Sequence, residues 1–310
     1  RSTLFPYTTL FRSPYRQVLY NEFSEPVFGP LPFPDGLRIL PVREFERQDS
    51  DSSVSASLSY QWTPDFMTYV SFAEGFKGGG FDQRVFPPRG PDGRPATFAP
   101  ERLTQYEAGW KWQNDASTVR INGAVFFSDY EDVQVRVVDV VAPGVGNAGA
   151  GEVRGAEIEL AMRPAPALRL EASVGYLDTE ITELGVNIDP DADRIRVGNR
   201  FINSPEWSLA ASGSYTFAVS GDSELTARVD WSWRDKVYNN WANDESIAQD
   251  ALSLVNASLT WNLPGSGWDF VLAGRNLTDE LYIVTGNNEI DTFGYTERSE
   301  EHTSELQSPI

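Results

Sequence analysis

The side chains that most enzymes use for nucleophilic or metal-assisted chemistry are nearly absent from this chain. It has no cysteine, and its single histidine, His302, lies close to the C-terminal end. A body without imidazole or thiol groups excludes most zinc sites, Ser-His triads and cysteine nucleophiles. We therefore expect no catalytic residue, no metal site and no cofactor site, and the protein is not predicted to be an enzyme.

Two stretches could still hold a charged ligand. The glycine-rich run 75–81 contains Lys77, but a phosphate-binding loop places Lys before Ser or Thr at the start of a helix, and no helical pattern follows. Glycines that permit a bend at the end of a strand explain the run better. Asp189, Asp191 and Asp193 could bind calcium, yet they lack the glycine and closing glutamate of an EF-hand. A solvated acidic loop is the expected structure there.

The elements that position these residues are predicted to be strands. The clearest pattern runs from Glu224 to Arg234, where apolar and polar residues alternate. Its apolar members are Leu225, Ala227, Val229, Trp231 and Trp233, and its polar members are Glu224, Thr226, Arg228, Asp230, Ser232 and Arg234. Because successive side chains of a strand point to opposite faces, this pattern predicts a sheet with one apolar and one polar face.

We expect about ten such strands, and several are long enough to cross a tilted bilayer, which takes ~9–11 residues. They are predicted at Ser53–Trp62, Phe66–Phe76, Thr104–Trp112, Ser117–Val135, Glu152–Met162, Leu168–Ile181, Glu206–Phe217, Glu224–Val237, Leu252–Leu263 and Trp268–Ile283. No apolar run approaches the ~18 residues of a membrane-spanning helix. Any crossing of a membrane would therefore be made by strands.

The links between these strands alternate between short and long. The short links are Thr63 to Asp65, Gln113 to Ala116, Arg163 to Ala167, Ala218 to Ser223 and Pro264 to Gly267. The long links are Lys77 to Leu103, Val141 to Gly151, Thr182 to Pro205 and Tyr238 to Asp250. Tight turns at one rim and large loops at the other are typical of an antiparallel transmembrane β-barrel, with short periplasmic turns and long extracellular loops.

Aromatic residues near the short turns support a membrane location. Trp62, Trp112, Phe217, Trp261 and Trp268 lie beside these turns, and such rings favour the bilayer interface. A soluble β-sandwich or propeller would also alternate apolar and polar residues, with its apolar faces in a core. Strand length, unequal loops and aromatic strand ends favour the barrel.

The net charge of the chain limits the classes of molecule that it is expected to bind. The net charge is −20 at pH 7, which argues against nucleic acid as a partner. The outer-membrane lipid is the expected surrounding of the apolar face.

The two ends of the chain are expected to lie outside the fold. Residues 1–13 and 298–310 resemble translated sequencing adapters, and we predict that neither pairs with a strand. Residues 14–52 are rich in proline and aromatic residues and are predicted to form a loop-rich barrel segment. The barrel proper is expected over residues 53–297.

Five blocks occur in order along the predicted strands: Tyr69 to Phe81, Pro100 to Lys111, Asn147 to Glu159, Gly198 to Pro205 and Gly274 to Asp279. Together they resemble the C-terminal half of the barrel of TonB-dependent outer-membrane receptors. The resemblance implies active uptake of a bulky, scarce nutrient, most often an iron–siderophore complex, across the outer membrane of a Gram-negative bacterium. It also implies that the TonB complex powers this uptake.

The resemblance also defines what this chain is expected to lack. The plug domain and the TonB-contacting segment lie N-terminal to the barrel in that family, and a final strand is expected after Tyr295. About ten strands with two unpaired edges predict an open half-barrel. A passive porin-like channel and a soluble carbohydrate-binding β-protein remain the alternatives.

Candidate ligand-contacting residues lie in the last long loop. Tyr238, Asn239, Asn240 and Trp241 combine aromatic rings with amides and could contact the imported ligand. Rim residues with no ligand role are an equally open interpretation of this stretch.

Overall fold

The computed structural model describes residues 2–13, 47–81, 97–138, 143–186, 188, 194–219, 221–264 and 267–285. Asp189, Asp191 and Asp193, most of the segment 14–52 and the segment 298–310 lie outside these ranges. None of the described residues forms a helix long and apolar enough to span a membrane. The helix η2 (Glu245–Ile247) has three residues.

The main sheet is antiparallel and has eleven strands. These are β1 (Ser2–Ser13), β2 (Asp49–Thr63), β3 (Phe66–Lys77), β6 (Glu101–Gln113), β7 (Val119–Glu131), β10 (Gly151–Ala165), β11 (Leu168–Ile181), β12 (Trp207–Ala218), β13 (Glu224–Arg234), β14 (Leu252–Leu263) and β15 (Trp268–Gly274). Two small sheets pair β4 (Gly80–Phe81) with β5 (Thr97–Phe98), and β8 (Gln134–Val138) with β9 (Pro143–Asn147).

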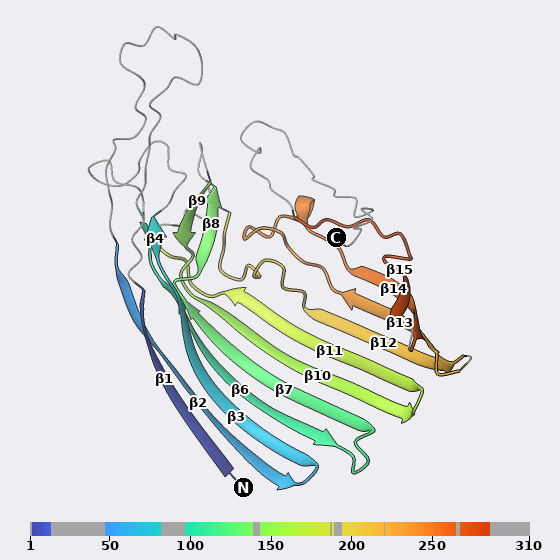
Figure 1. Ribbon diagram of the computed structural model, residues 1–310. Helices are drawn as coiled ribbons and strands as arrows, with labels where there is room; N and C mark the ends of the chain where they lie inside the picture. The colour runs from blue at the N-terminus through green and yellow to red at the C-terminus, as the bar shows by residue number, and fades with distance from the viewer. Residues whose placement is uncertain are drawn as a thin grey trace.

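The strands follow one another in chain order from β1 to β15, and these two outermost strands do not pair (Figure 1). The expected open half-barrel is confirmed. Strands of this sheet contact mainly their hydrogen-bonded neighbours, so within the described residues no second layer of the sheet packs across it. A soluble sandwich, which needs two packed sheets, does not fit this arrangement.

Turns and loops separate to opposite ends of the strands, as the lengths of the links predicted. Short connections such as Pro64–Asp65 and Pro166–Ala167 close hairpins at one end, which we call the turn end. The long connections, the two small sheets and η2 lie at the other end, which we call the loop end (Figure 1). Most strands of the sheet have 11–15 residues, well beyond the ~5–6 common in soluble proteins.

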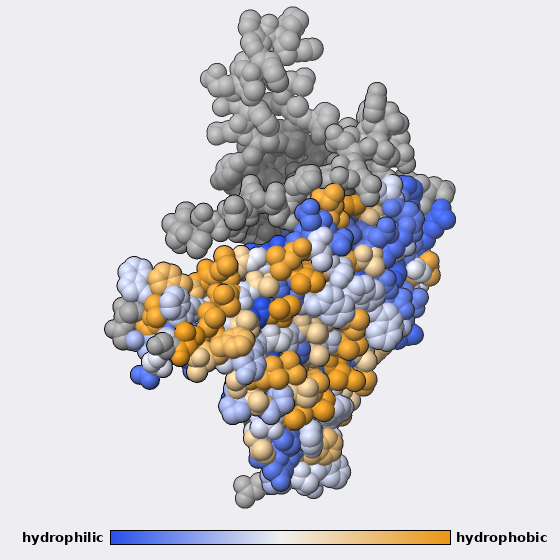
Figure 2. Space-filling model, turned by 90° about the vertical axis from the view of Figure 1, so that its right-hand side faces the viewer, coloured by the Kyte–Doolittle hydropathy of each residue, from blue (hydrophilic) through white to orange (hydrophobic). Residues whose placement is uncertain are grey.

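The two faces of the sheet differ in chemistry. The outer face carries large apolar side chains with no protein neighbour to cover them; Val125, Ile158 and Val229 remain 57%, 52% and 52% exposed. Figure 2 shows apolar residues spread over the middle of one side of the molecule, with hydrophilic residues gathered toward the upper end. Aromatic residues near the turn end, among them Trp62 and Trp268, are also exposed. Such a surface requires an apolar solvent.

Three predicted strands are longer than the observed ones; one of them, Glu224–Val237, ends at Arg234. The expected strand Ser117–Val135 breaks after Glu131, because Asp132 has a left-handed backbone (φ 55°), and β8 then joins a different sheet. The expected strand Trp268–Ile283 ends at Gly274, because Asn276 and Asp279 also have positive φ angles of 48° and 53°. Asn and Asp adopt this conformation more readily than other side chains, and it cannot continue a strand.

The prediction that the N-terminal segment pairs with no strand is wrong. β1 pairs with β2 in an unbroken antiparallel register from Ser2↔Tyr60 to Ser13↔Asp49. An edge strand presents a row of free N–H and C=O groups, which any extended segment can satisfy with its backbone alone. Backbone pairing at an edge therefore depends little on the amino-acid sequence of the added strand.

The assignment of faces predicts the cost of a charge on the outer face. In the complete receptor, Val229→Arg is expected to lower the free energy of unfolding from lipid vesicles by ~2–4 kcal/mol if Val229 lies near the bilayer midplane. Thr226→Arg on the same strand is the control, because Thr226 shares its face with Arg228. Equal losses of stability in the two variants would show that the faces are assigned wrongly.

The open edges predict the behaviour of this chain on its own. Each unsatisfied backbone group in hydrocarbon costs several kcal/mol, so an uncovered edge cannot persist in a membrane. Expressed alone and transferred to detergent, the chain should aggregate or stay unfolded. Heat-modifiable migration on a gel, or ion conductance in a planar bilayer, would instead indicate a small self-contained pore.

Candidate functional site

The main cluster of buried apolar side chains lies among the loops rather than between the strands. We call this group the loop cluster; Tyr130, Leu184, Phe201 and Trp241 pack against it. Its members are Val133, Val135, Ala148, Ile181, Ile188 and Ile195. A single-layered sheet has no interior of its own, so apolar residues can leave water only where the loops fold onto each other.

Backbone contacts hold the segments that carry the loop cluster together. The N–H of Gly185 donates to the carbonyl of Ala148 (2.5 Å), and the N–H of Ala150 donates to that of Glu183 (3.2 Å). Gly149 has φ 108°, and a Cβ at either Gly149 or Gly185 would collide with the facing backbone. Glycine is required here because two loop backbones approach too closely for a side chain.

A reciprocal pair of hydrogen bonds, which we call the loop clamp, joins the loops 182–206 and 235–251. The side chain of Asn243 accepts from the N–H of Arg200 (2.6 Å) and donates to its carbonyl (2.9 Å). Asn243 can do this because it has a left-handed backbone, with φ 55°. Arg194 and Asp244 add an ion pair of 2.7 Å between the same loops. The rim is therefore built as one connected layer.

The four predicted ligand-contacting residues form part of this layer. Trp241 packs edge-on against Phe201 with ring centroids 5.2 Å apart. Asn239 donates to the carbonyl of Ile247 (2.6 Å), and Asn240 donates to the carboxylate of Asp244 (2.7 Å). The hydroxyl of Tyr238 donates to Glu245 (3.1 Å). Each of these side chains thus has a role in building the loop, whether or not it also contacts a ligand.

Glu245 is the electrostatic centre of the outermost part of this loop. It accepts hydrogen bonds from Lys236 and Tyr238, and the ammonium group of Lys236 lies 5.1 Å from the centre of the Tyr238 ring. The hydrogen bond from Lys236, followed by that from Tyr238, lowers the pKa of Glu245 below its ordinary value of 4.5. Reciprocally, Glu245 raises the pKa of Lys236.

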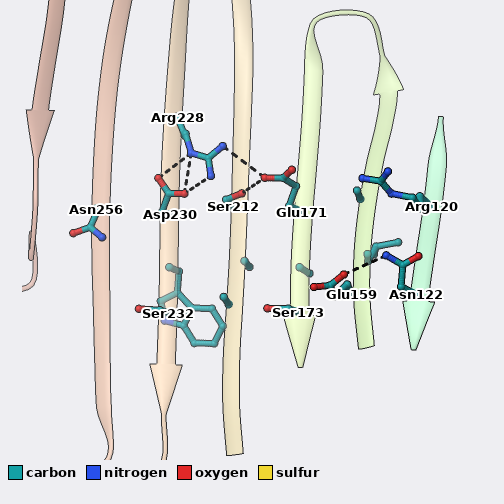
Figure 3. A pocket seen from close by; sticks show the side chains of 16 residues that line it. Arg120, Asn122, Glu159, Glu171, Ser173, Ser212, Arg228, Asp230, Ser232 and Asn256 are labelled. Carbon is teal, nitrogen blue, oxygen red and sulfur yellow. Dashed lines mark hydrogen bonds and ion pairs between the residues drawn. The ribbon is translucent and has the colours of Figure 1, made fainter. Parts of the chain in front are cut away.

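Below the loops, the inner face carries a strip of charged and amide side chains across β7 to β14 (Figure 3). Arg228 binds Asp230 on its own strand (2.6 Å) and lies 3.7 Å from Glu171 on β11. Ser212, on the strand between them, donates to Glu171 (3.3 Å). These residues line an open groove of about 420 Å³. The inner face is thus a wet wall with its charges mostly paired.

Metal-ion and phosphate binding each require a particular arrangement of residues. Within the described residues, no group of three or more His, Asp or Glu side chains could hold a metal ion. The glycine-rich run 75–81 ends a strand, as expected, and Gly80 packs under the ring of Phe98. It leads from β3 into the short strand β4 rather than into the helix start that a phosphate-binding loop requires.

Comparison with known proteins identifies the family. A family model described as the TonB dependent receptor-like β-barrel matches residues 29–277. The chain belongs to this family. Members of the TonB-dependent receptor barrel family are receptors and transporters of the Gram-negative outer membrane, not enzymes.

Individual relatives are more distant. The chain is 28% identical over 137 residues to the pesticin receptor of Yersinia enterocolitica, covering 44% of this chain and 20% of that protein. It is 24% identical over 192 residues to the probable TonB-dependent siderophore receptor PiuA of Acinetobacter baumannii, covering 60% of this chain and 24% of that protein. Thus the chain spans about a quarter or less of the length of these relatives.

A solved structure supports the fold. The ferric yersiniabactin uptake receptor FyuA from Yersinia pestis superposes with a TM-score of 0.64 and 22% identity, over 79% of this chain and 35% of that chain. At this identity the match establishes the shared barrel architecture only.

The loop clamp and the ion pair Arg194–Asp244 were not foreseen from the sequence. Their partners are 43 and 50 residues apart, and each residue type is common in solvated loops. One available signal was the pair of polar blocks Gly198–Arg200 and Asn203–Pro205, whose position inside a long loop suggests a structural role.

Removal of the clamping side chain should separate the loops without disturbing the sheet. Asn243→Gly keeps a residue that tolerates positive φ but leaves both backbone groups of Arg200 without a partner. We expect the free energy of local opening, measured by hydrogen exchange at the amide of Arg200, to fall by about 1–3 kcal/mol. Asn203→Gly is the matched control, since Asn203 has the same backbone conformation (φ 53°) and an exposed side chain. Unchanged exchange at Arg200 would rule out the clamp.

The lowered pKa of Glu245 predicts a pH dependence of the outer loop. Because its pKa in the folded state is below the unfolded value, the contact with Lys236 contributes above pH 4.5 and is lost as the pH falls through the folded pKa. Titration of the Glu245 carboxyl carbon by NMR should give a midpoint below 4.5. Lys236→Gln should move the midpoint up, and a midpoint already at 4.5 in the unaltered protein would contradict the contact.

Proposed function

We propose that this chain is the C-terminal part of the barrel of an outer-membrane receptor that imports an iron–siderophore complex, with energy from the TonB complex. The observation that carries the proposal is the family match across residues 29–277. Two relatives, a probable siderophore receptor and a ferric yersiniabactin uptake receptor, favour a siderophore as the cargo.

The geometry agrees with capture of a bulky ligand. The loop cluster and the loop clamp make the loops a connected rim around the loop end of the barrel, so little conformational entropy is lost when a ligand binds. Tyr238, Asn239, Asn240 and Trp241 belong to this rim, and we propose that they contribute contacts to the ligand. Polar side chains on the inner face then provide a wet path toward the turn end.

Under this proposal three parts of the receptor come from outside this chain: the remaining strands, the plug and the segment that contacts TonB. An open half-barrel cannot close a pore, so the missing strands belong to the same receptor. The plug and the segment that contacts TonB are expected upstream of the barrel. The complete receptor, rather than this chain, is therefore the object of a functional test.

The test is iron uptake by a siderophore-deficient Gram-negative host that expresses the complete receptor. A panel of ferric siderophores is supplied under iron limitation, and radioactive iron entering the cells is measured. Uptake of at least one complex should require both the receptor and TonB. An inactivated TonB gene in the same host is the control, and uptake that persists without TonB would favour a passive porin-like channel.

A further inference from the structure

One guanidinium on the inner face is not neutralised by the wall. Arg234 lies at the end of β13 nearest the loops, and its Nε atom is buried without a hydrogen-bond partner. Within the described residues, no carboxylate forms an ion pair with it. The side chain as a whole is half-buried, but a buried N–H without a partner is unfavourable, and proteins rarely retain one unless something else supplies the missing acceptor.

The same strand provides a direct comparison. Arg228 faces the same side of β13, and its guanidinium is held by Asp230 and approached by Glu171. Both arginines belong to the same alternating pattern, yet only Arg228 has acidic partners in the wall, one on its own strand and one on β11. At Arg234 the directly paired positions on the neighbouring strands are Ser208 and Leu252, which carry no charge.

The space beside Arg234 is suited to a small polar group. It lines an open pocket of about 410 Å³ together with Ser173, Ser208 and Ser232. The register places these serines on strands β11, β12 and β13, all on the inner face with Arg234. Three hydroxyls and a planar guanidinium present several donors to one region and no competing negative charge.

We propose that Arg234 and these serines form a carboxylate-binding site on the inner wall just below the loops. A guanidinium pairs with both oxygens of a carboxylate, and the serine hydroxyls can donate to the same oxygens. The carboxylate has two sources: an acidic side chain of a segment that fills the barrel in the complete receptor, or an acidic ligand on its way through. Which of these two sources supplies the carboxylate depends on the proposed function. The existence of the carboxylate-binding site does not depend on it.

The experiment uses the complete receptor in detergent, with free citrate as the carboxylate probe and sodium chloride at equal ionic strength as its control. The variants are Arg234→Gln and Arg234→Lys. Arg163→Gln is the matched control, because Arg163 is exposed near the turn end and its substitution removes the same charge. The melting temperature and the dissociation constant of citrate are measured for each protein.

If the site is open to a ligand, citrate should raise the melting temperature of the unaltered receptor, and Arg234→Gln should weaken citrate binding by about tenfold. Arg234→Lys should also bind more weakly, because it keeps the charge but not the paired donors. If an internal carboxylate already occupies the site, citrate should have no effect, and Arg234→Gln alone should lower the melting temperature.

The proposal is overturned if neither citrate nor Arg234→Gln changes the melting temperature beyond the change seen in Arg163→Gln. This outcome is separate from the iron-uptake test. If the receptor imports no ferric siderophore but binds citrate through Arg234, the proposed function is disproved and the carboxylate-binding site is still supported.

Discussion

The need to pair every backbone N–H and C=O group in hydrocarbon governs this structure. Water cannot supply the missing partners there, so each strand must be hydrogen-bonded to a neighbour along its length. The antiparallel registers from β1 to β15, with shifts between Gln61 and Thr63 and between Met162 and Ala165, satisfy this need along most of the sheet but not at its two outer edges. It also explains why β1, which was expected to stay apart, lies along β2: the edge of β2 accepts any extended backbone.

Because the sheet has a single layer, its outer and inner faces are both uncovered by protein and differ in chemistry. Its outer residues, such as Val125 and Val229, are more than half exposed, with no second protein layer packed over them. Its inner residues meet water, and carboxylates such as Glu171 and Asp230 are paired with arginine. The hydrophobic effect therefore orders the loops instead, where Ile181 and Ile195 are 0% and 1% exposed. The loop layer supplies the rigid rim that capture of a ligand would use.

Local pattern predicted the strands well and the loop contacts poorly. The predicted limits of Leu168–Ile181 and Leu252–Leu263 are those of β11 and β14. The alternation could not reveal that Asp132 and Asn276 turn to positive φ, since both are polar residues at acceptable positions. Nor could it find Asn243, whose partner Arg200 is brought near only by the curvature and register of the whole sheet.

The central claim is that alternate residues of each strand face lipid and water, and cysteine scanning tests it most directly. The chain has no cysteine of its own, so single cysteines can be placed from Leu225 to Trp233 in the complete receptor in lipid vesicles. A water-soluble maleimide should label positions 226, 228, 230 and 232, while a lipid-soluble quencher should reach probes at 225, 227, 229, 231 and 233. Labelling with no two-residue period, or with the two sets exchanged, would contradict the account.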